Sequence, residues 1–347
     1  DYNSLEEDEV ADLVCEILVE PPEDYAVSAE EAATLAYSEI ITRNLVNQPA
    51  NMMDPIALAA AACELGEENG FEVEVLEKEQ IIDLGMEAFM SVAKASDLDP
   101  RFIIMRYKGA PDSDERLGLV GKGLTYDSGG LSIKPTKSME TMKSDMGGAA
   151  AVIGAMSAIA REELNVNVTA VVAACENMIS GRSYRPGDII GSMAGKTIYI
   201  GNTDAEGRLT LIDAMHYIVT REEVSRVIDI ATLTGAVLHC LGTVATGSVS
   251  NDDEFYKTVE EGYESAGELV HRLPIYDEYK EQVKHTQADL TNLAGRPGTI
   301  TAGIFIGEFT NDLPWVHLDI AGSSWTDKVK GITSKGGTGA GARPLYY

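Results

Sequence analysis

The chain has 347 residues, of which 44% are hydrophobic and 24% are charged, and its mean hydropathy is -0.07. This composition excludes a disordered or fibrous protein and allows one or two domains with a large buried core. The 27 basic and 56 acidic residues give a formal net charge of -29, which disfavours nucleic acid as a partner because the surface repels phosphate on average. No run of about 18 apolar residues is present, so no membrane partner is expected.

The cysteines indicate a reducing compartment. Four are present, they lie far apart in the sequence, and none belongs to a C-x-x-C pair: Cys15, Cys63, Cys175 and Cys240. This pattern is typical of buried thiols and not of a disulfide framework or a zinc knot. Residues 1–9 are acidic where a signal peptide would be basic, so we expect a cytoplasmic protein.

Helical patterns dominate the beginning of the chain. Apolar residues at helical spacing predict a short acidic helix within 5–18, which ends at Pro21 and Pro22. An S-x-x-E capping box predicts that a second helix begins at Ser28, and this helix should end near Asn47.

A third helix has signals at both ends, and strands then alternate with helices. Asp54 is the expected N-cap, Pro55 the first helical residue and Gly70 the residue just past the end. The expected strands cover 71–76, 102–107, 117–121, 168–175, 227–232 and 315–320.

Several of these strands are almost continuously apolar, which indicates burial on both faces. We therefore predict an α/β fold with a mixed, largely parallel central sheet flanked by helices on both faces. The expected division is an acidic N-terminal segment, 1–27, and one domain, 28–347.

The segment VGKGLTYDSGGLSIKP, at 120–135, presents Lys122, Asp127 and Lys134 among four glycines, directly after a buried strand. Glycines at such a place allow the backbone to approach a ligand closely. The spacing matches neither a phosphate-binding loop nor a dinucleotide fingerprint, which disfavours nucleotide binding.

Two further segments carry acidic residues. In MKSDMGGAA, Asp145 precedes an alanine-rich helix, where the alternative role is an ordinary N-terminal cap. In NTDAEGRL, Asp204 and Glu206 are two residues apart, so an extended backbone would aim both carboxylates at one point. The alternative for this segment is an exposed acidic turn.

These segments together supply four carboxylates: Asp127, Asp145, Asp204 and Glu206. Four converging negative charges repel one another unless cations neutralise them, and two divalent ions carry the matching charge. None of the five histidines lies in a short metal-binding pair, which disfavours a single-zinc protease.

The sequence resembles the leucyl (cytosol) aminopeptidases, a family of dinuclear metallopeptidases that remove N-terminal amino acids. NTDAEGRL is close to the family signature, and the family's other motifs occur in order between about 28 and 344: VGKG, YDSGG, SIKP, MKSDMGGAA, ENMISG, RPGDII, ATLTGA and HLDIAG. The resemblance implies that one metal is bound by Lys122, Asp127, Asp145 and Glu206. It implies that the other is bound by Asp127, Asp204 and Glu206.

The resemblance also implies a mechanism. A hydroxide that bridges the two metals attacks the scissile carbonyl, Lys134 polarises that carbonyl, and Arg208 holds a bicarbonate that acts as general base. Lys122 can bind a metal only as the neutral amine, so we expect the two cations to depress its pKa. Further substrate or bicarbonate contacts are carried over to Leu233, Met142, Asn202, Thr232, Gly235 and Ala321.

The expected cofactors are two divalent ions per chain, Zn or Mn, with Co or Mg as alternatives, together with bicarbonate. The expected substrates are peptides with a free N-terminus, with Leu, Met and similar residues released over a broad range. The family implies a homohexamer and an N-terminal domain that we expect to be absent or trimmed here. The alternative functions are a dipeptidase such as a cysteinylglycine hydrolase and a DNA-binding regulatory protein.

Overall fold

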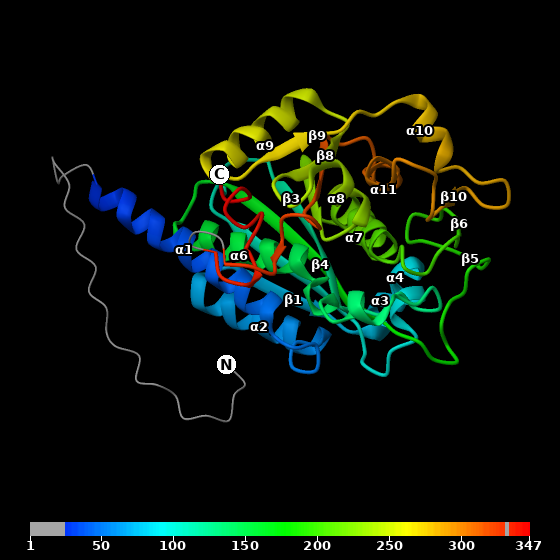
Figure 1. Cartoon of the computed structure of the whole chain (residues 1–347). Helices are drawn as coiled ribbons and strands as arrows, with labels where there is room; N and C mark the ends of the chain where they lie inside the picture. The colour runs from blue at the N-terminus through cyan, green and yellow to red at the C-terminus, as the bar shows by residue number, and fades with distance from the viewer. Residues whose placement is uncertain (1–24, 330–332) are drawn as a thin grey trace.

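The computed structural model of the chain describes residues 25–329 and 333–347 (Figure 1). The helix predicted within 5–18 lies outside these residues, as does Cys15. The other three cysteines, Cys63, Cys175 and Cys240, are free thiols, as the sequence predicted. The expectation that they are buried is confirmed for Cys175 and wrong for the exposed Cys240, and Cys63 is half-buried.

An eight-stranded sheet forms the centre of the molecule, in the order β1-β2-β4-β3-β7-β11-β8-β9. The four central strands, β4, β3, β7 and β11, run parallel to one another, whereas the β1–β2, β2–β4 and β11–β8 pairs are antiparallel. The predicted mixed α/β sheet is therefore confirmed. The strands are β1 (Glu72–Leu76), β2 (Arg101–Lys108), β3 (Leu117–Asp127), β4 (Asn167–Asn177), β7 (Arg226–Ala231), β8 (Thr246–Ser250), β9 (Val270–Arg272) and β11 (Trp315–Asp319).

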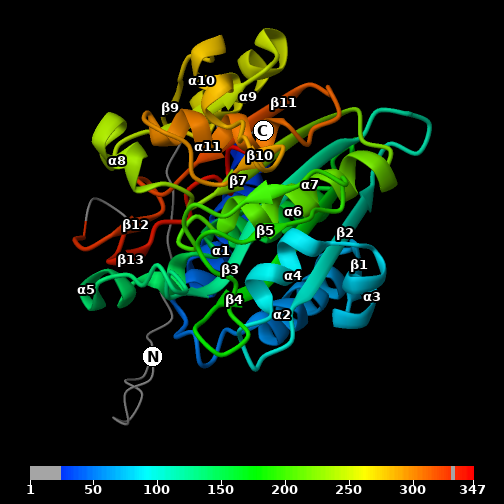
Figure 2. The same ribbon diagram turned by 90° about the vertical axis from the view of Figure 1, so that its right-hand side faces the viewer.

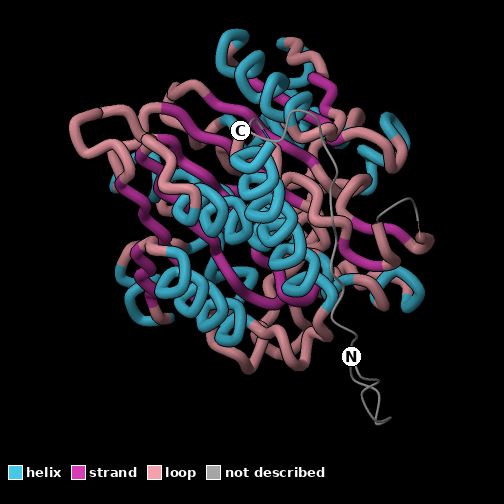
Figure 3. Tube along the Cα trace, turned by 90° about the vertical axis from the view of Figure 1, so that its left-hand side faces the viewer, coloured by secondary structure: helices cyan, strands magenta, loops and turns pink. Residues whose placement is uncertain are grey.

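Helices cover both faces of this sheet. One face carries α1 (Tyr25–Asn47), α2 (Pro55–Asn69), α6 (Gly147–Arg161) and α9 (Asp253–Ser265), and Figure 3 looks onto these helices with the strands behind them. The other face carries α3 (Lys78–Asp83), α4 (Glu87–Ala93), α7 (Gly207–Arg221) and α11 (Gly298–Gly307), seen in Figure 2.

The alternation of side chains along a strand separates the two cores. On β2, Phe102 and Ile104 pack in the core beneath α4 and α7, whereas Ile103 and Met105 pack in the core beneath α1, α2 and α6. All four side chains are fully buried. The continuously apolar strands are thus explained by a sheet that is covered on both sides.

The remaining elements are short and lie around the edges of the sheet. They are α5 (Thr136–Met139), a 3-10 turn (Met142–Ser144), β5 (Ile189–Ile190), β6 (Ile198–Tyr199), α8 (Gly235–Leu241), α10 (Asp277–Gln282), β10 (Leu290–Thr291), β12 (Trp325–Thr326) and β13 (Gly336–Gly337). Among them, β5, β6 and β10 form a separate three-stranded sheet.

The end signals of the third predicted helix, α2, are confirmed. The Asp54 carboxylate accepts hydrogen bonds from the backbone N–H groups of Ile56 and Ala57, and Gly70 ends the helix in the left-handed region at φ 91°. The predicted start of α1 is wrong, because the helix begins at Tyr25 and Ser28 lies inside its first turn. The sequence Tyr-Ala-Val before Ser28 contains nothing that opposes helix, so the helix extends one turn beyond the capping box.

Glycines bring the start of α6 into direct contact with the sheet. A Cβ atom on Gly148 would lie 2.0 Å from the carbonyl oxygen of Ile230 on β7. A Cβ atom on Gly121 of β3 would lie 2.7 Å from the Cα of Ala149. Because backbone packs against backbone here, the residues just before α6 lie close to the end of β3.

Candidate metal centre

Strand β3 supplies the first two candidate ligands. The predicted strand at 117–121 is too short, since β3 continues to Asp127 and carries both Lys122 and Asp127. Residues five apart on a regular strand point to opposite faces. The pairing of β3 with β4 shifts register between Leu124 and Tyr126, which accommodates Thr125 as an extra residue. This bulge brings Lys122 and Asp127 to the same side of the strand.

The second pair of candidate ligands comes from the turn before α7. One oxygen from each of Asp127, Asp204 and Glu206 lies within 4.8 Å of the others. The expected convergence of carboxylates therefore occurs. The expected extended backbone is wrong, because residues 203–204 form a turn and Glu206, just before α7, has helical backbone angles, φ -83° and ψ -37°.

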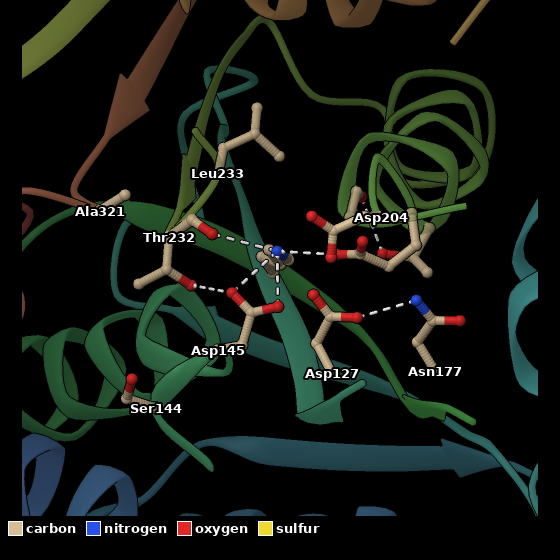
Figure 4. Close-up of polar contacts among 12 residues, drawn as sticks. Asp127, Ser144, Asp145, Asn177, Asp204, Thr232, Leu233 and Ala321 are labelled. Carbon is tan, nitrogen blue, oxygen red and sulfur yellow. Dashed lines mark hydrogen bonds and ion pairs between the residues drawn. The ribbon is translucent and has the colours of Figure 1, made fainter. Parts of the chain in front are cut away.

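Asp145 lies on the other side of Lys122. The Lys122 Nζ is 2.8 Å from Asp145 Oδ1, 3.0 Å from Glu206 Oε1 and 3.0 Å from the carbonyl oxygen of Thr232, to which it donates. Figure 4 shows the Asp127 and Asp145 carboxylates side by side. Asp145 precedes α6 by two residues and is not its N-cap, which is Met146. The capping alternative for Asp145 is therefore wrong.

Burial and mutual repulsion control the ionisation of this cluster. Burial raises the pKa of Asp145 and of Glu206, and repulsion from the Asp127 carboxylate raises both further. Burial lowers the pKa of Lys122, but attraction by Asp145, Glu206 and Asp127 outweighs burial and raises it overall. The protein alone thus keeps Lys122 charged, and only added positive charge would favour the neutral amine that a metal requires.

Lys134 reaches into the same cluster. Its Nζ lies 2.7 Å from Asp127 Oδ2 and 2.5 Å from Asp204 Oδ1. The side chain leaves the loop after β3, which turns through Gly129 and Gly130 in the left-handed region, at φ 86° and 62°. Lys134 therefore lies beside the candidate ligands, where a carbonyl bound to them would be within its reach.

Arg208 is buried in the first turn of α7, and its Nη1 donates to the carbonyl oxygen of Asn292 at 2.9 Å. Its Nε has no hydrogen-bond partner within 25–329 and 333–347. Burial lowers the pKa of Arg208 to about 10. A buried guanidinium with an unused donor suits a small anion.

The donor set fits divalent cations. Four carboxylates meet only two lysines, and Glu206 Oε2 is buried without a hydrogen-bond partner in the described part of the chain. An unpartnered carboxylate oxygen is costly unless a cation occupies its remaining lone pairs. Carboxylate oxygens with one amine admit Zn, Mn, Co or Mg.

The other residues predicted to contact substrate or bicarbonate lie around the carboxylate cluster. Thr232 donates from Oγ1 to Asp145 Oδ1 at 2.9 Å, and the backbone N–H groups of Leu233 and Ala321 both donate to the Asp319 carboxylate. Asn202 Oδ1 accepts from the backbone N–H of Asp204 at 2.7 Å. Met142 is half-buried in the 3-10 turn before Asp145, and Gly235 is exposed at the start of α8.

Three residues that contact the candidate ligands or the loops beside them were not identified from the sequence. The Asn177 amide donates to Asp127 Oδ1 at 2.8 Å and to the carbonyl oxygen of Thr203 at 3.0 Å, as Figure 4 shows for Asp127. Asp319 holds the turn that contains Leu233, and Asn292 contacts the 201–205 loop. Asn177 and Asp319 each end a buried strand, a polar signal that could have identified them.

The family model described as "Cytosol aminopeptidase family, catalytic domain" matches residues 40–346. A probable cytosol aminopeptidase of Clostridium perfringens is 55% identical over 319 residues, which are 91% of this chain and 65% of that protein. A probable cytosol aminopeptidase of Clostridium tetani is 51% identical over 339 residues, 97% of this chain and 70% of that protein. The chain therefore spans about two thirds of the length of these relatives. No helix in the described ranges combines the length and apolar character needed to cross a bilayer.

Proposed function

The chain belongs to the cytosol aminopeptidase family, and we propose that it is a metal-dependent aminopeptidase that releases N-terminal residues from peptides. The observation that carries this proposal is the convergence of Asp127, Asp204 and Glu206 within 4.8 Å, beside Lys122 and Asp145. The match over 40–346, inside the proposed catalytic domain 28–347, favours this activity over the dipeptidase and DNA-binding alternatives.

We assign one divalent cation to Lys122, Asp127, Asp145 and Glu206, and a second to Asp127, Asp204 and Glu206. When bound, such cations would lower the pKa of a water molecule and polarise the substrate carbonyl. The unpartnered Glu206 Oε2 supports this assignment. Zn or Mn are the proposed metals.

The chain's own residues position the substrate and move charge. Lys134, held at the cluster by Asp127 and Asp204, is placed to donate a hydrogen bond to the oxyanion that develops on the scissile carbonyl. Arg208 offers its unused Nε to bicarbonate, which would accept the proton released by the attacking water. Thr232, with Met142, Gly235 and Ala321, is the proposed wall for a Leu or Met side chain, and the Leu233 backbone is proposed to lie beside the reacting carbonyl and the bicarbonate.

The decisive experiment is hydrolysis of leucine p-nitroanilide after chelation, with Mn or Zn added back and the bound metal counted. We expect activity to return as about two ions bind per chain, the number of a two-metal site. Failure to bind metal would overturn the proposal. Comparing tripeptides with dipeptides tests the dipeptidase alternative.

Two further proposals concern the whole protein. We propose a cytoplasmic location, which the printed names of the relatives support. We also propose a homohexamer, from the family resemblance. Sedimentation that shows a stable, fully active monomer would overturn the hexamer.

A further inference from the structure

Asn292 lies outside every motif quoted in the sequence analysis. Both ends of its side chain contact the 201–205 loop, which carries the candidate ligand Asp204. Asn292 is fully buried just after β10. Its Oδ1 accepts from the backbone N–H groups of Gly201, at 2.8 Å, and Asn202, at 3.4 Å. Its Nδ2 donates to the carbonyl oxygens of Asn202, at 2.7 Å, and Ala205, at 3.1 Å.

The backbone of the same residue extends this contact in both directions. Asn292 N–H donates to the carbonyl oxygen of Tyr199 at 3.1 Å, which continues the parallel pairing of β10 with β6. The Asn292 carbonyl oxygen accepts from Arg208 Nη1 at 2.9 Å. A single residue therefore contacts the chain before the loop, the loop itself and the arginine after it.

These contacts require an amide. The two N–H donors on one side and the two carbonyl acceptors on the other fix which end of the side chain is oxygen and which is nitrogen. A carboxylate at this position would direct an oxygen at two carbonyl oxygens. An alanine would leave the N–H groups of Gly201 and Asn202 and the carbonyl oxygen of Ala205 without partners, and the Asn202 carbonyl with only a 3.4 Å contact from the Ala205 N–H.

We propose that Asn292 is a positioning residue that holds Asp204, Glu206 and Arg208 as one unit. This inference rests on the proposed function, because it gives the loop a metal to bind. Asn292 lies next to the ligands and supplies none itself, so it acts by fixing the loop conformation from which Asp204 and Glu206 project. Residues of this kind typically affect metal affinity by 10- to 100-fold.

The chain contains a matched control. Asn167, at the start of β4, also uses one buried amide to hold a loop: it donates to the carbonyl oxygens of Ala110, Ser113 and Glu115, and it accepts from the N–H of Ala110. Asn167 and Asn177 lie at opposite ends of β4, so the Asn167 loop is at the end of the sheet away from the candidate ligands.

The experiment is calorimetric titration of metal-free protein with Mn²⁺, together with a thermal melt, for N292A, N292D, N167A and N167D. We expect both Asn292 variants to bind Mn²⁺ about 10- to 100-fold more weakly than wild type. We expect the Asn167 variants to lose thermal stability while they keep wild-type affinity. N292D retains the side-chain size, so it remains informative should N292A fail to fold.

Wild-type Mn²⁺ affinity in folded Asn292 variants would overturn the proposal, as would an equal loss of affinity in the Asn167 variants. The titration needs no peptidase activity, which separates this inference from the proposed function. A wild-type protein that binds two ions but cleaves no peptide would overturn the proposed function, and the affinity differences would still support the role of Asn292. A wild-type protein that binds no Mn²⁺ would overturn both.

Discussion

Buried carboxylates lie in the central sheet and beside it, and their surroundings differ. Asp229, on β7, accepts at one oxygen from Trp315 Nε1 and lies at the other 2.6 Å from His317 Nδ1, so both of its oxygens are bound. Glu206 is equally buried, yet its Oε2 has no partner among residues 25–329 and 333–347. Burial alone therefore does not identify a site. A buried carboxylate whose hydrogen bonds are complete supports the fold, and one whose hydrogen bonds are incomplete indicates a ligand.

The largest expected effect comes from Glu206→Gln, which removes the charge of the proposed bridging ligand. We expect metal binding to fall below two ions per chain and kcat to fall by more than about 10³-fold, beyond the usual loss for one stabilising donor. The metal-free variant should be at least as stable as metal-free wild type, because a charge no longer has to be buried and its repulsion with Asp127 is relieved. Metal counting, kinetics and thermal melts test this, and two retained ions would argue against bridging.

Asp229→Ala should have the opposite pattern. Loss of Asp229 leaves Trp315 Nε1 and His317 Nδ1 without their carboxylate in a fully buried position, so we expect a loss of about 3–5 kcal/mol in the free energy of unfolding. The folded variant should still bind two ions. Urea denaturation and metal counting measure the two effects, and a loss of metal without a loss of stability would contradict the distinction between Asp229 and Glu206.

Lys134→Ala tests the part of the site that we assign to the oxyanion. We expect both ions to remain bound and kcat to fall about 10²- to 10³-fold, the usual cost of one oxyanion donor. The KM for a short peptide should change less than kcat, because the hydrogen bond strengthens as charge develops. Loss of an ion in this variant would instead give Lys134 a role in holding the ligands.

Glu268 has surroundings intermediate between those of Asp229 and Glu206. One of its oxygens accepts a hydrogen bond from the Gly341 N–H, and the other is 3.7 Å from Arg343 Nη2. Burial raises the pKa of Glu268 to about 7, from an ordinary value of 4.5. The folded protein therefore binds this proton more tightly than the unfolded chain. The resulting stability is complete below about pH 4.5 and is lost as the pH rises to about 7.

At 1.36 kcal/mol for each pH unit, this contribution reaches at most about 3 kcal/mol. Glu268→Gln should therefore reduce the loss of stability between pH 4.5 and 7. The exposed Glu261→Gln variant is the control, and its pH profile should match wild type. Unfolding free energies measured across this range test the prediction, and parallel profiles for Glu268→Gln and wild type would contradict it.

Local signals in the sequence predicted much of the fold. The caps of α2 and the presence of the apolar central strands depend on neighbouring residues alone, and they were predicted correctly, although the predicted strand at 117–121 ended six residues too early. The four carboxylates could be grouped because their charges demand a common cation. The bulge at Thr125 could not be predicted, because it depends on how β3 pairs with β4. Asn292 could not be predicted either, because its partners lie about 90 positions away.

The glycine contact beneath α6 restricts how proteins with this site can diverge. Any side chain at Gly148 or Gly121 would push α6 away from the sheet and carry Asp145 with it. This side of the site therefore cannot change without loss of the candidate ligand Asp145. The opposite side of the site is held differently, since Asp319 binds Leu233 and Ala321 through their backbone N–H groups and not through their side chains. Substrate preference should therefore change more readily on the Asp319 side of the site than on the side under α6.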